Sequence, residues 1–211
     1  MGLRALVRLR RGRWIILSEA DKRHWEKITR ELVKLKDTSE MMMDLAYSAL
    51  LLNSSYLAEE VMTLEEQMDT LHIELQSEVL SCIGEETNPR ELLGLIRMGN
   101  VTERIADAAS EIAEIVLRGV EPHPILGMVI QDAEETVEHV TVTESSPLAG
   151  KTLREAQIAD ETGMWVLYIR RGNRWMKPRP NTRLEPGDLV VASGYSEGEE
   201  DFKQLLSGKK K

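Results

Sequence analysis

The sequence lacks the residues that stabilise small secreted proteins or bind zinc. Its 211 residues include one cysteine, Cys82, and four histidines. A single cysteine excludes an internal disulfide, and so few scattered thiol and imidazole groups exclude a Cys/His zinc site. No apolar run reaches the roughly 18 residues that span a bilayer, because Asp44 and Ser48 interrupt the most hydrophobic stretch, at 41–52. We therefore expect a cytoplasmic protein that does not insert directly into a membrane.

Basic residues are missing from a long central stretch of the chain. Residues 37–89 contain twelve carboxylates and no lysine or arginine, whereas residues 170–183 contain six basic residues and no acid. The formal net charge is -9, although residues 1–17 alone carry five arginines. Nucleic-acid binding needs a basic surface that contacts phosphates, so this acidic body indicates that nucleic acid is not a partner.

Three apolar seams with steps of three and four residues predict three long helices between residues 18 and 120. The clearest seam begins at Leu57 and ends before Gly84, and Asn88-Pro89 supplies an N-cap and a first-turn proline for the next helix. None of these helices can bury its seam alone, and the connections are short. The pattern predicts an antiparallel bundle in which each seam faces the core. The seam of the third helix consists of Met98, Val101, Ile105, Ala108, Ile112 and Ile115.

The C-terminal part of the chain has the pattern of a small sheet. Thr152 with Glu155 forms a capping box for a short helix, and turns are predicted at Gly172-Asn173 and at Pro186-Gly187-Asp188. The predicted order is strand, helix, strand, strand, strand, helix, with the last helix near Phe202. The strands are expected at 139–143, 164–169, 174–177 and 189–193.

The predicted division of the chain follows these changes of pattern. The first segment is interpreted as a short basic arm, a hairpin that turns at Arg11-Gly12, or a stretch upstream of the native start, because it lacks the cleavage site of an export signal. The predicted parts are a basic N-terminal arm at 1–17, a helical bundle at 18–120, a linker at 121–136, a sheet domain at 137–206 and a tail at 207–211.

Two segments of the sheet domain carry a family resemblance. Residues 146–156 read SPLAGKTLREA and residues 184–191 read LEPGDLVV. Both resemble the TrkA C-terminal domain, also called RCK-C, and the resemblance covers residues 137–206. It implies a small regulatory module that dimerises, that associates with potassium channels, potassium uptake systems or cation/proton antiporters, and that senses small ligands.

The helical half carries one Glu-x-x-x-Asp pair on each predicted helix, at 40/44, 65/69 and 103/107. This motif resembles that of the PhoU-like domain, a three-helix bundle that carries metal ions on its surface. The expected fold class is α+β, with an N-terminal antiparallel three-helix PhoU-like bundle followed by a small α/β TrkA-C domain. This combination, without a transmembrane part or a dinucleotide-binding domain, resembles a class of stand-alone prokaryotic proteins linked to potassium transport.

The paired carboxylates are candidate metal ligands. A four-residue step places both members of a pair on the same helix face. Carboxylates without thiolates select hard cations such as magnesium, manganese or iron, and a nearby histidine adds a nitrogen ligand. The phases of the helices do not require the three pairs to converge, and a solvated acidic face partly paired with Arg90, Arg97 and Arg104 is the alternative. The candidates are Glu40, Asp44, Glu65, Asp69, His72, Glu103 and Asp107.

A second candidate site is the arginine cluster around the predicted hairpin. Arginine forks match phosphates, and the family resemblance implies an anionic nucleotide such as cyclic di-AMP at the interface between two copies, near Val166–Arg170. A solubilising edge whose arginines discourage aggregation is the alternative. Trp165 and Trp175 are interpreted as core or dimer-face residues. The candidate ligand-binding residues are Arg170, Arg171, Asn173 and Arg174.

No arrangement of a nucleophile with a base, and no phosphate-binding glycine loop, is present in the sequence, so we expect no enzyme activity. We expect a non-catalytic regulatory protein of potassium or other monovalent cation transport. It is expected to form a homodimer or higher homo-oligomer and to contact a membrane cation channel or transporter. The alternatives are a PhoU-like metal-binding regulator of phosphate uptake signalling and, as a third class, a metal-dependent hydrolase.

Overall fold

A computed structural model describes residues 5–8, 14–17, 19–83, 88–119 and 135–208. The chain divides into two compact units, one of Met1–Tyr47 with Ser55–Leu117 and the other of Ser48–Ser54 with Arg118–Lys211. The predicted linker at 121–136 lies almost entirely outside the described residues. Within the N-terminal segment, strands β1 (Ala5–Arg8) and β2 (Trp14–Leu17) pair antiparallel, and the turn predicted at Arg11-Gly12 lies outside the described residues.

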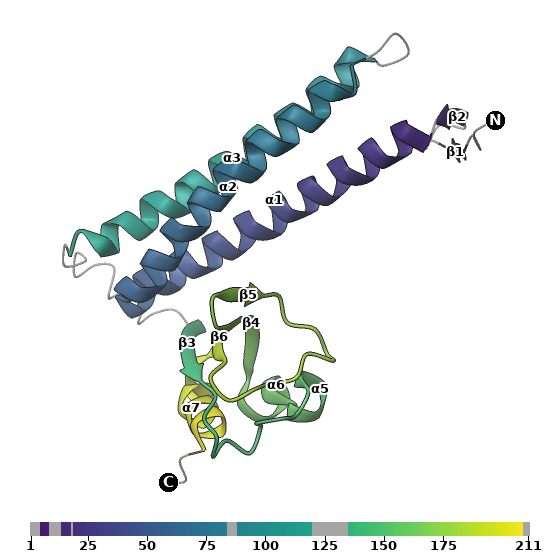
Figure 1. The fold of residues 1–211 in the computed structure, drawn as a ribbon. Coiled ribbons are helices and arrows are strands. Elements are labelled where there is room, and N and C mark those ends of the chain that lie inside the picture. Colours follow the sequence, from purple (N-terminus) through teal and green to yellow (C-terminus); the bar gives the residue numbers. More distant parts are fainter. Residues whose placement is uncertain (1–4, 9–13, 18, 84–87, 120–134, 209–211) are drawn as a thin grey trace. The chain divides into compact units, whose positions relative to one another are not determined.

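Three long helices make up most of the first unit (Figure 1). They are α1 (Glu19–Leu52), α2 (Ser55–Ser81) and α3 (Pro89–Leu117), which confirms the predicted helical bundle. Asn53 adopts a left-handed backbone with φ of 47° and turns the chain from α1 into α2. Asn88 caps α3, because its Oδ1 accepts a hydrogen bond of 3.1 Å from the backbone N–H of Arg90.

Antiparallel neighbours in the bundle are tied by polar as well as apolar contacts. Near the start of α1, His24 Nδ1 lies 2.5 Å from Glu78 Oε1 of α2, and Lys27 Nζ donates to Glu78 Oε2 at 2.5 Å. Glu78 is buried, and these two partners compensate for the loss of water around its carboxylate. The core of α2 follows the predicted seam, since Leu57, Val61, Leu64, Met68 and Leu75 are all buried.

Helix α3 buries a different face from the one that its apolar seam predicts. Its buried residues include Gly99, Ala106 and Ala113, which recur every seven residues, whereas Met98 and Ile105 of the predicted seam are exposed. The predicted orientation of α3 is therefore wrong by one residue, or about 100° around the helix axis. Small residues let two helix backbones approach closely, and this stripe of small side chains packs against α2.

The second unit contains a four-stranded antiparallel sheet in the order β3-β6-β4-β5. The predicted order of elements is confirmed, except that two short helices take the place of one. The strands are β3 (Glu135–Thr141), β4 (Met164–Arg171), β5 (Arg174–Met176) and β6 (Leu189–Tyr195). The helices are α5 (Leu153–Ala156), α6 (Ile158–Thr162) and α7 (Glu199–Ser207), and a short 3-10 turn, η1 (Ser196–Gly198), precedes α7.

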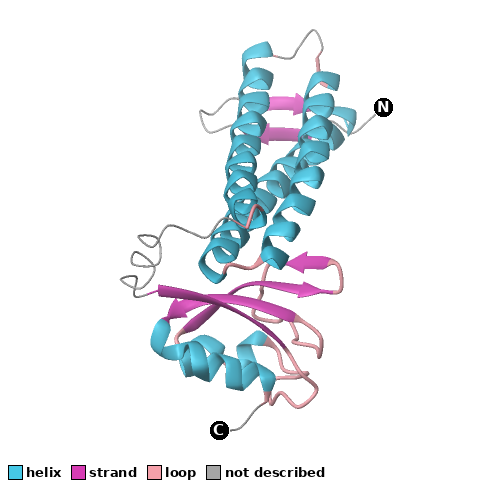
Figure 2. Ribbon diagram, turned by 90° about the vertical axis from the view of Figure 1, so that its left-hand side faces the viewer, coloured by secondary structure: helices cyan, strands magenta, loops and turns pink. Residues whose placement is uncertain are grey.

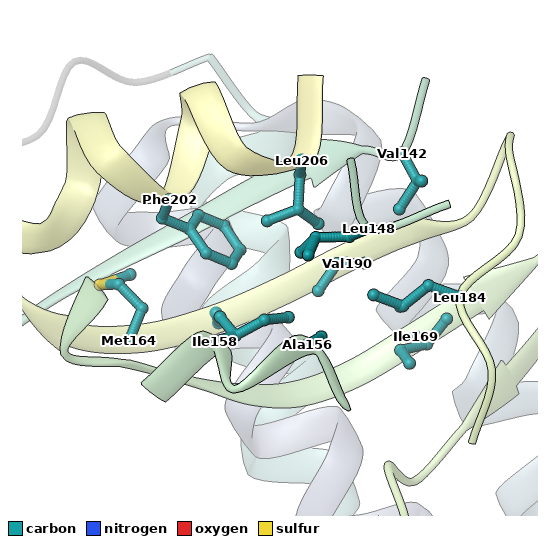
Figure 3. Close-up of a cluster of buried hydrophobic side chains, with 11 residues drawn as sticks. Val142, Leu148, Ala156, Ile158, Met164, Ile169, Leu184, Val190, Phe202 and Leu206 are labelled. Carbon is teal, nitrogen blue, oxygen red and sulfur yellow. The ribbon is translucent and has the colours of Figure 1, made fainter. Parts of the chain in front are cut away.

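The helices α5, α6 and α7 lie on one face of this sheet and enclose its hydrophobic core (Figures 2 and 3). Phe202 and Leu206 of α7 point toward the strands, where Met164, Ile169 and Val190 are fully buried. The capping box predicted at Thr152 is present: Thr152 accepts from the backbone of Glu155 while the Glu155 side chain accepts from the backbone of Thr152. The architecture as a whole matches the α+β expectation.

Candidate functional site

Side chains of the sheet alternate between the helix-covered face and the opposite face, which we call the open face of the sheet domain because α5, α6 and α7 do not cover it. Tyr168 and Val191 on this face are nevertheless buried. On β4, Met164 and Ile169 belong to the core under the helices. Their odd spacing of five residues arises because a β-bulge between Val166 and Tyr168 inserts one extra residue. Alternation from Ile169 then places Arg170 on the open face and Arg171 on the helix side.

The strand register separates the predicted ligand residues. Arg170 pairs with Trp175, and Arg171 pairs with Arg174. Residues opposite each other in paired strands share a face, so Arg170 lies on the face opposite to Arg171 and Arg174. Asn173 lies in the turn between β4 and β5 and is exposed. The four predicted residues therefore surround the end of one hairpin, but no single face of the sheet collects all of them.

Arg171 is engaged within the domain. Its guanidinium donates from Nε to Asp188 Oδ1 and from Nη2 to Asp188 Oδ2, both at 2.8 Å. It also donates to Glu185 Oε1 at 2.5 Å and to the Arg183 carbonyl at 2.7 Å. Asp188 has no exposed surface, so the arginine neutralises a buried carboxylate. These contacts give Arg171 a structural role, holding the turn before β6.

Two aromatic side chains mark the open face of the sheet. Trp165 of β4 is 52% exposed and Tyr195 of β6 is 48% exposed, and their rings meet edge to face with centroids 6.0 Å apart. The sequence predicts that Trp165 is either a core or a dimer-face residue. Its exposure shows that it does not belong to the core. Tyr195 was missed, because its position beside Trp165 follows from the pairing of β4 with β6 rather than from a local motif.

His139 also belongs to the open face, since Val140 beside it packs against the core. Burial, with a smaller contribution from Lys203, lowers the pKa of His139 below its usual value. The imidazole is therefore neutral at pH 7, and its Nδ1 is buried without a hydrogen-bond partner in the described part of the chain. Arg170 adds its guanidinium group to this face.

In the first unit, the structure brings together five of the seven predicted metal ligands. Burial raises the pKa of Glu65, and the neighbouring charges that raise it further include Asp69 of α2 and both Glu103 and Asp107 of α3. His72 Nδ1 lies 3.9 Å from Glu103 Oε1. The carboxylates of α3 face α2 because α3 buries its small-residue face. We call Glu65, Asp69, His72, Glu103 and Asp107 the α2–α3 acidic cluster.

Hydrogen bonds position His72 beside this cluster. His72 Nε2 lies 2.9 Å from Asn100 Oδ1 and 3.0 Å from Gln76 Nε2.

The other two predicted metal ligands lie on α1. Glu40 pairs with Lys36 one turn earlier, at 2.7 Å, and Asp44 is half-buried on the same helix. Among residues that the structure describes, no three His, Cys, Asp or Glu side chains are arranged to hold a metal ion.

None of the helices in the described ranges is both long enough and apolar enough to cross a membrane.

The described part of the chain offers two candidate surfaces. One is the open face of the sheet domain with Arg170, Trp165 and Tyr195. The other is the α2–α3 acidic cluster.

Known proteins resemble parts of this chain. The "Probable potassium channel protein 2" of Methanocaldococcus jannaschii is 31% identical over 125 residues, which are 57% of this chain and 33% of that protein. The chain thus spans about a third of the length of this curated relative. The RCK_C domain dimer of S. agalactiae BusR in complex with c-di-AMP is 22% identical, with a TM-score of 0.32, over 33% of this chain and 93% of that chain. The RCK C domain of the potassium transport protein KtrA, also in complex with c-di-AMP, is 24% identical, with a TM-score of 0.32, over 38% of this chain and 94% of that chain.

Two family models match the chain, one for each unit. The PhoU domain model matches residues 32–116, which cover most of α1 and nearly all of α2 and α3. The TrkA-C domain model matches residues 137–207, from β3 to the end of α7. The resemblance drawn from the SPLAGKTLREA and LEPGDLVV segments and from the Glu-x-x-x-Asp pairs is confirmed. Together the two models place a PhoU domain at 32–116 and a TrkA-C domain at 137–207.

Proposed function

We propose that this chain is a non-catalytic, ligand-sensing regulator of potassium or other monovalent cation transport. The observation that carries the proposal is the TrkA-C domain at 137–207, together with 31% identity to a probable potassium channel protein. The ligand is a small anion, and a nucleotide such as cyclic di-AMP is the first candidate. The protein acts in the cytoplasm on a membrane cation channel or transporter.

The ligand site that we propose is the open face of the sheet domain. Arg170 supplies a positive charge near the end of β4, and the exposed ring of Trp165 supplies an apolar surface near the start of the same strand. Guanidinium groups bind phosphates with two parallel hydrogen bonds, and aromatic rings stack on nucleobases. Two exposed aromatic side chains are costly on an isolated surface, so we propose that two copies meet at this face and share the ligand.

The mechanism that follows is differential binding. A ligand held between two copies stabilises the relative arrangement of the sheet domains in which both arginines reach it. The helical bundles of the two copies move with that arrangement and change their contact with the transporter. A ligand can shift this equilibrium only by the difference between its affinities for the two arrangements.

A thermal-stability screen tests this proposal. The purified protein is treated with chelator and its melting temperature is measured with cyclic di-AMP, other nucleotides and divalent cations. A ligand that binds only the folded state raises the melting temperature. A rise with a nucleotide supports the transport-sensor function. A rise with a divalent cation alone supports the second candidate below.

The second candidate is a PhoU-like metal-binding regulator of phosphate uptake signalling, in which the sheet domain only mediates dimerisation. The α2–α3 acidic cluster favours it, because burial and four nearby carboxylates raise the pKa of Glu65, and a divalent cation would relieve this repulsion. Magnesium, manganese and iron suit such oxygen ligands. This function would be supported by stoichiometric metal in the purified protein that is lost in the Glu65→Gln, Asp69→Asn variant and kept in the Glu59→Gln, Glu74→Gln variant, which changes two exposed positions of the same helix. A protein that purifies without metal, and whose melting temperature does not change when these cations are added, would rule out this second function.

A further inference from the structure

Helix α3 carries a continuous apolar stripe that its own bundle leaves exposed. The largest exposed fractions are 57% for Met98, 48% for Val101, 42% for Ile105 and 47% for Ile115. Ala108 is exposed as well, and Ile112 is half-buried. We call Met98, Val101, Ile105, Ala108, Ile112 and Ile115 the α3 stripe. An aligned row of aliphatic side chains on a soluble bundle indicates an interaction surface, whereas single exposed apolar residues are ordinary.

The spacing of the α3 stripe has the period of a coiled coil. Its six members alternate steps of three and four residues, so they repeat every 3.5 residues. The contact of α3 with its own bundle uses the neighbouring face of Gly99, Ala106 and Ala113. Two separate heptad repeats therefore run along this one helix. The first packs within the chain, and the second has the pattern that packs against another helix.

We propose that the α3 stripe binds the α3 stripe of a second copy of this chain in an antiparallel coiled coil. Placing Met98 opposite Ile115 of the second copy also places Val101 opposite Ile112 and Ile105 opposite Ala108. Each layer of the pair then joins two apolar residues, and the central layers combine a large with a small side chain. This alternation lets the two backbones approach closely at the two-fold axis.

The charges that flank the centre of the stripe are complementary in this antiparallel pairing. Arg97, Arg104, Glu111 and Arg118 occur every seven residues along one exposed edge of the stripe. The antiparallel register brings Arg104 beside Glu111 of the second copy, and the two-fold axis creates this pair twice. The same register brings Arg97 beside Arg118 of the second copy at each end, and these like-charged pairs oppose the attraction of the central pairs. A parallel register would instead place Arg104 beside Ala109.

Cysteine cross-linking tests the contact and its direction together. Met98→Cys and Ile115→Cys are made separately in the full chain with Cys82→Ser, and a short bismaleimide is added to each protein and to their mixture. In the proposed register two copies of residue 98 lie about 26 Å apart, from seventeen residues at 1.5 Å each. The mixture should therefore give covalent dimers, and neither protein alone should. Ile73→Cys, an exposed apolar position on α2, is the control and should remain uncross-linked.

Each other outcome overturns the proposal. Cross-linking of Met98→Cys with itself would mean a parallel pair. No cross-linking in any sample would mean that a second copy does not bind the stripe in this register. Arg104→Glu in both members of the mixture should reduce the yield at least about tenfold at low salt, and Arg104→Glu with Glu111→Arg should restore it. These readouts do not depend on ligand binding by the sheet domain. The coiled-coil proposal and the ligand-sensing function can therefore each be contradicted without affecting the other.

Discussion

Gly99 of α3 lies so close to Leu75 of α2 that a β-carbon built on Gly99 would be 2.8 Å from Leu75 Cδ2. This approach determines which face of α3 is buried. It turns the small residues of α3 inward, leaves the α3 stripe exposed, and brings Glu103 and Asp107 beside Glu65. One interhelical contact therefore sets both the exposed apolar surface and the acidic cluster.

Gly99→Val should separate α2 and α3. The added side chain collides with a fully buried leucine, and overpacking of this kind costs about 1–3 kcal/mol, which exceeds the gain in helix propensity. Chemical denaturation monitored by circular dichroism measures the change.

Gly94→Ala is the matched control on the same helix. Gly94 is exposed, and a β-carbon added there would have nothing within 4 Å. Alanine is the better helix former, so this variant should gain up to about 1 kcal/mol. Equal effects of the two substitutions would contradict the close approach at Gly99.

Glu65→Gln should stabilise the protein at neutral pH. Burial raises the pKa of Glu65 in the folded state above its ordinary value of 4.5, with Asp69 and Asp107 contributing. The folded state thus holds more protons than the unfolded state between the two pKa values, and stability falls as pH rises through that interval. The variant should melt higher than the natural protein at pH 7 and equally below about pH 4. Glu59→Gln, at an exposed position on the same helix, should show no such pH-dependent difference.

Glu78→Gln should destabilise the protein at neutral pH, which is the opposite of the effect expected for Glu65→Gln. Hydrogen bonds from Lys27 and His24 lower the pKa of Glu78 below 4.5, so this carboxylate contributes stability above its unfolded pKa and loses it as pH falls through its folded pKa. The variant should melt lower than the natural protein at pH 7, and the gap should narrow below pH 4.5. Glu74→Gln, an exposed position on the same helix, is the comparison. A gap that persists unchanged in acid would argue against the ion pairs.

Arg171→Ala should destabilise the sheet domain by about 3 kcal/mol, because it leaves the fully buried carboxylate of Asp188 without its bidentate partner. Arg174→Ala, on the facing strand position and exposed, should change stability by no more than about 0.5 kcal/mol. Denaturation monitored by tryptophan fluorescence compares the two. Similar losses in both variants would show that Arg171 has no special structural role.

Features governed by neighbouring residues could be predicted from the sequence. The cap at Asn88, the capping box of Thr152 and Glu155, and the turn at Gly172 all involve residues within four positions of one another. The three helices and the order of the strands follow from periodicity, which is also local. The α+β fold could therefore be predicted without any knowledge of long-range contacts.

The burial of α3 could not be predicted, because periodicity identifies an apolar face but not the surface that covers it. Two faces of α3 repeat every seven residues, and the one with larger side chains had the stronger apolar signal. The convergence of Glu65 with Glu103 was missed for the same reason. The roles of Arg171 and Tyr195 depend on strand register and on the β-bulge of β4, which involve residues far apart in sequence.

Isothermal titration of cyclic di-AMP into the full chain tests the central claim most directly. The account predicts saturable binding to the natural protein and an affinity at least about tenfold weaker for Arg170→Ala, because a charge-assisted hydrogen bond to phosphate is worth about 1.5–3 kcal/mol. Arg154→Ala, an exposed arginine on the helix-covered side, should bind like the natural protein. Equal affinities of Arg170→Ala and the natural protein, or no binding of any anionic nucleotide, would contradict a ligand site on the open face.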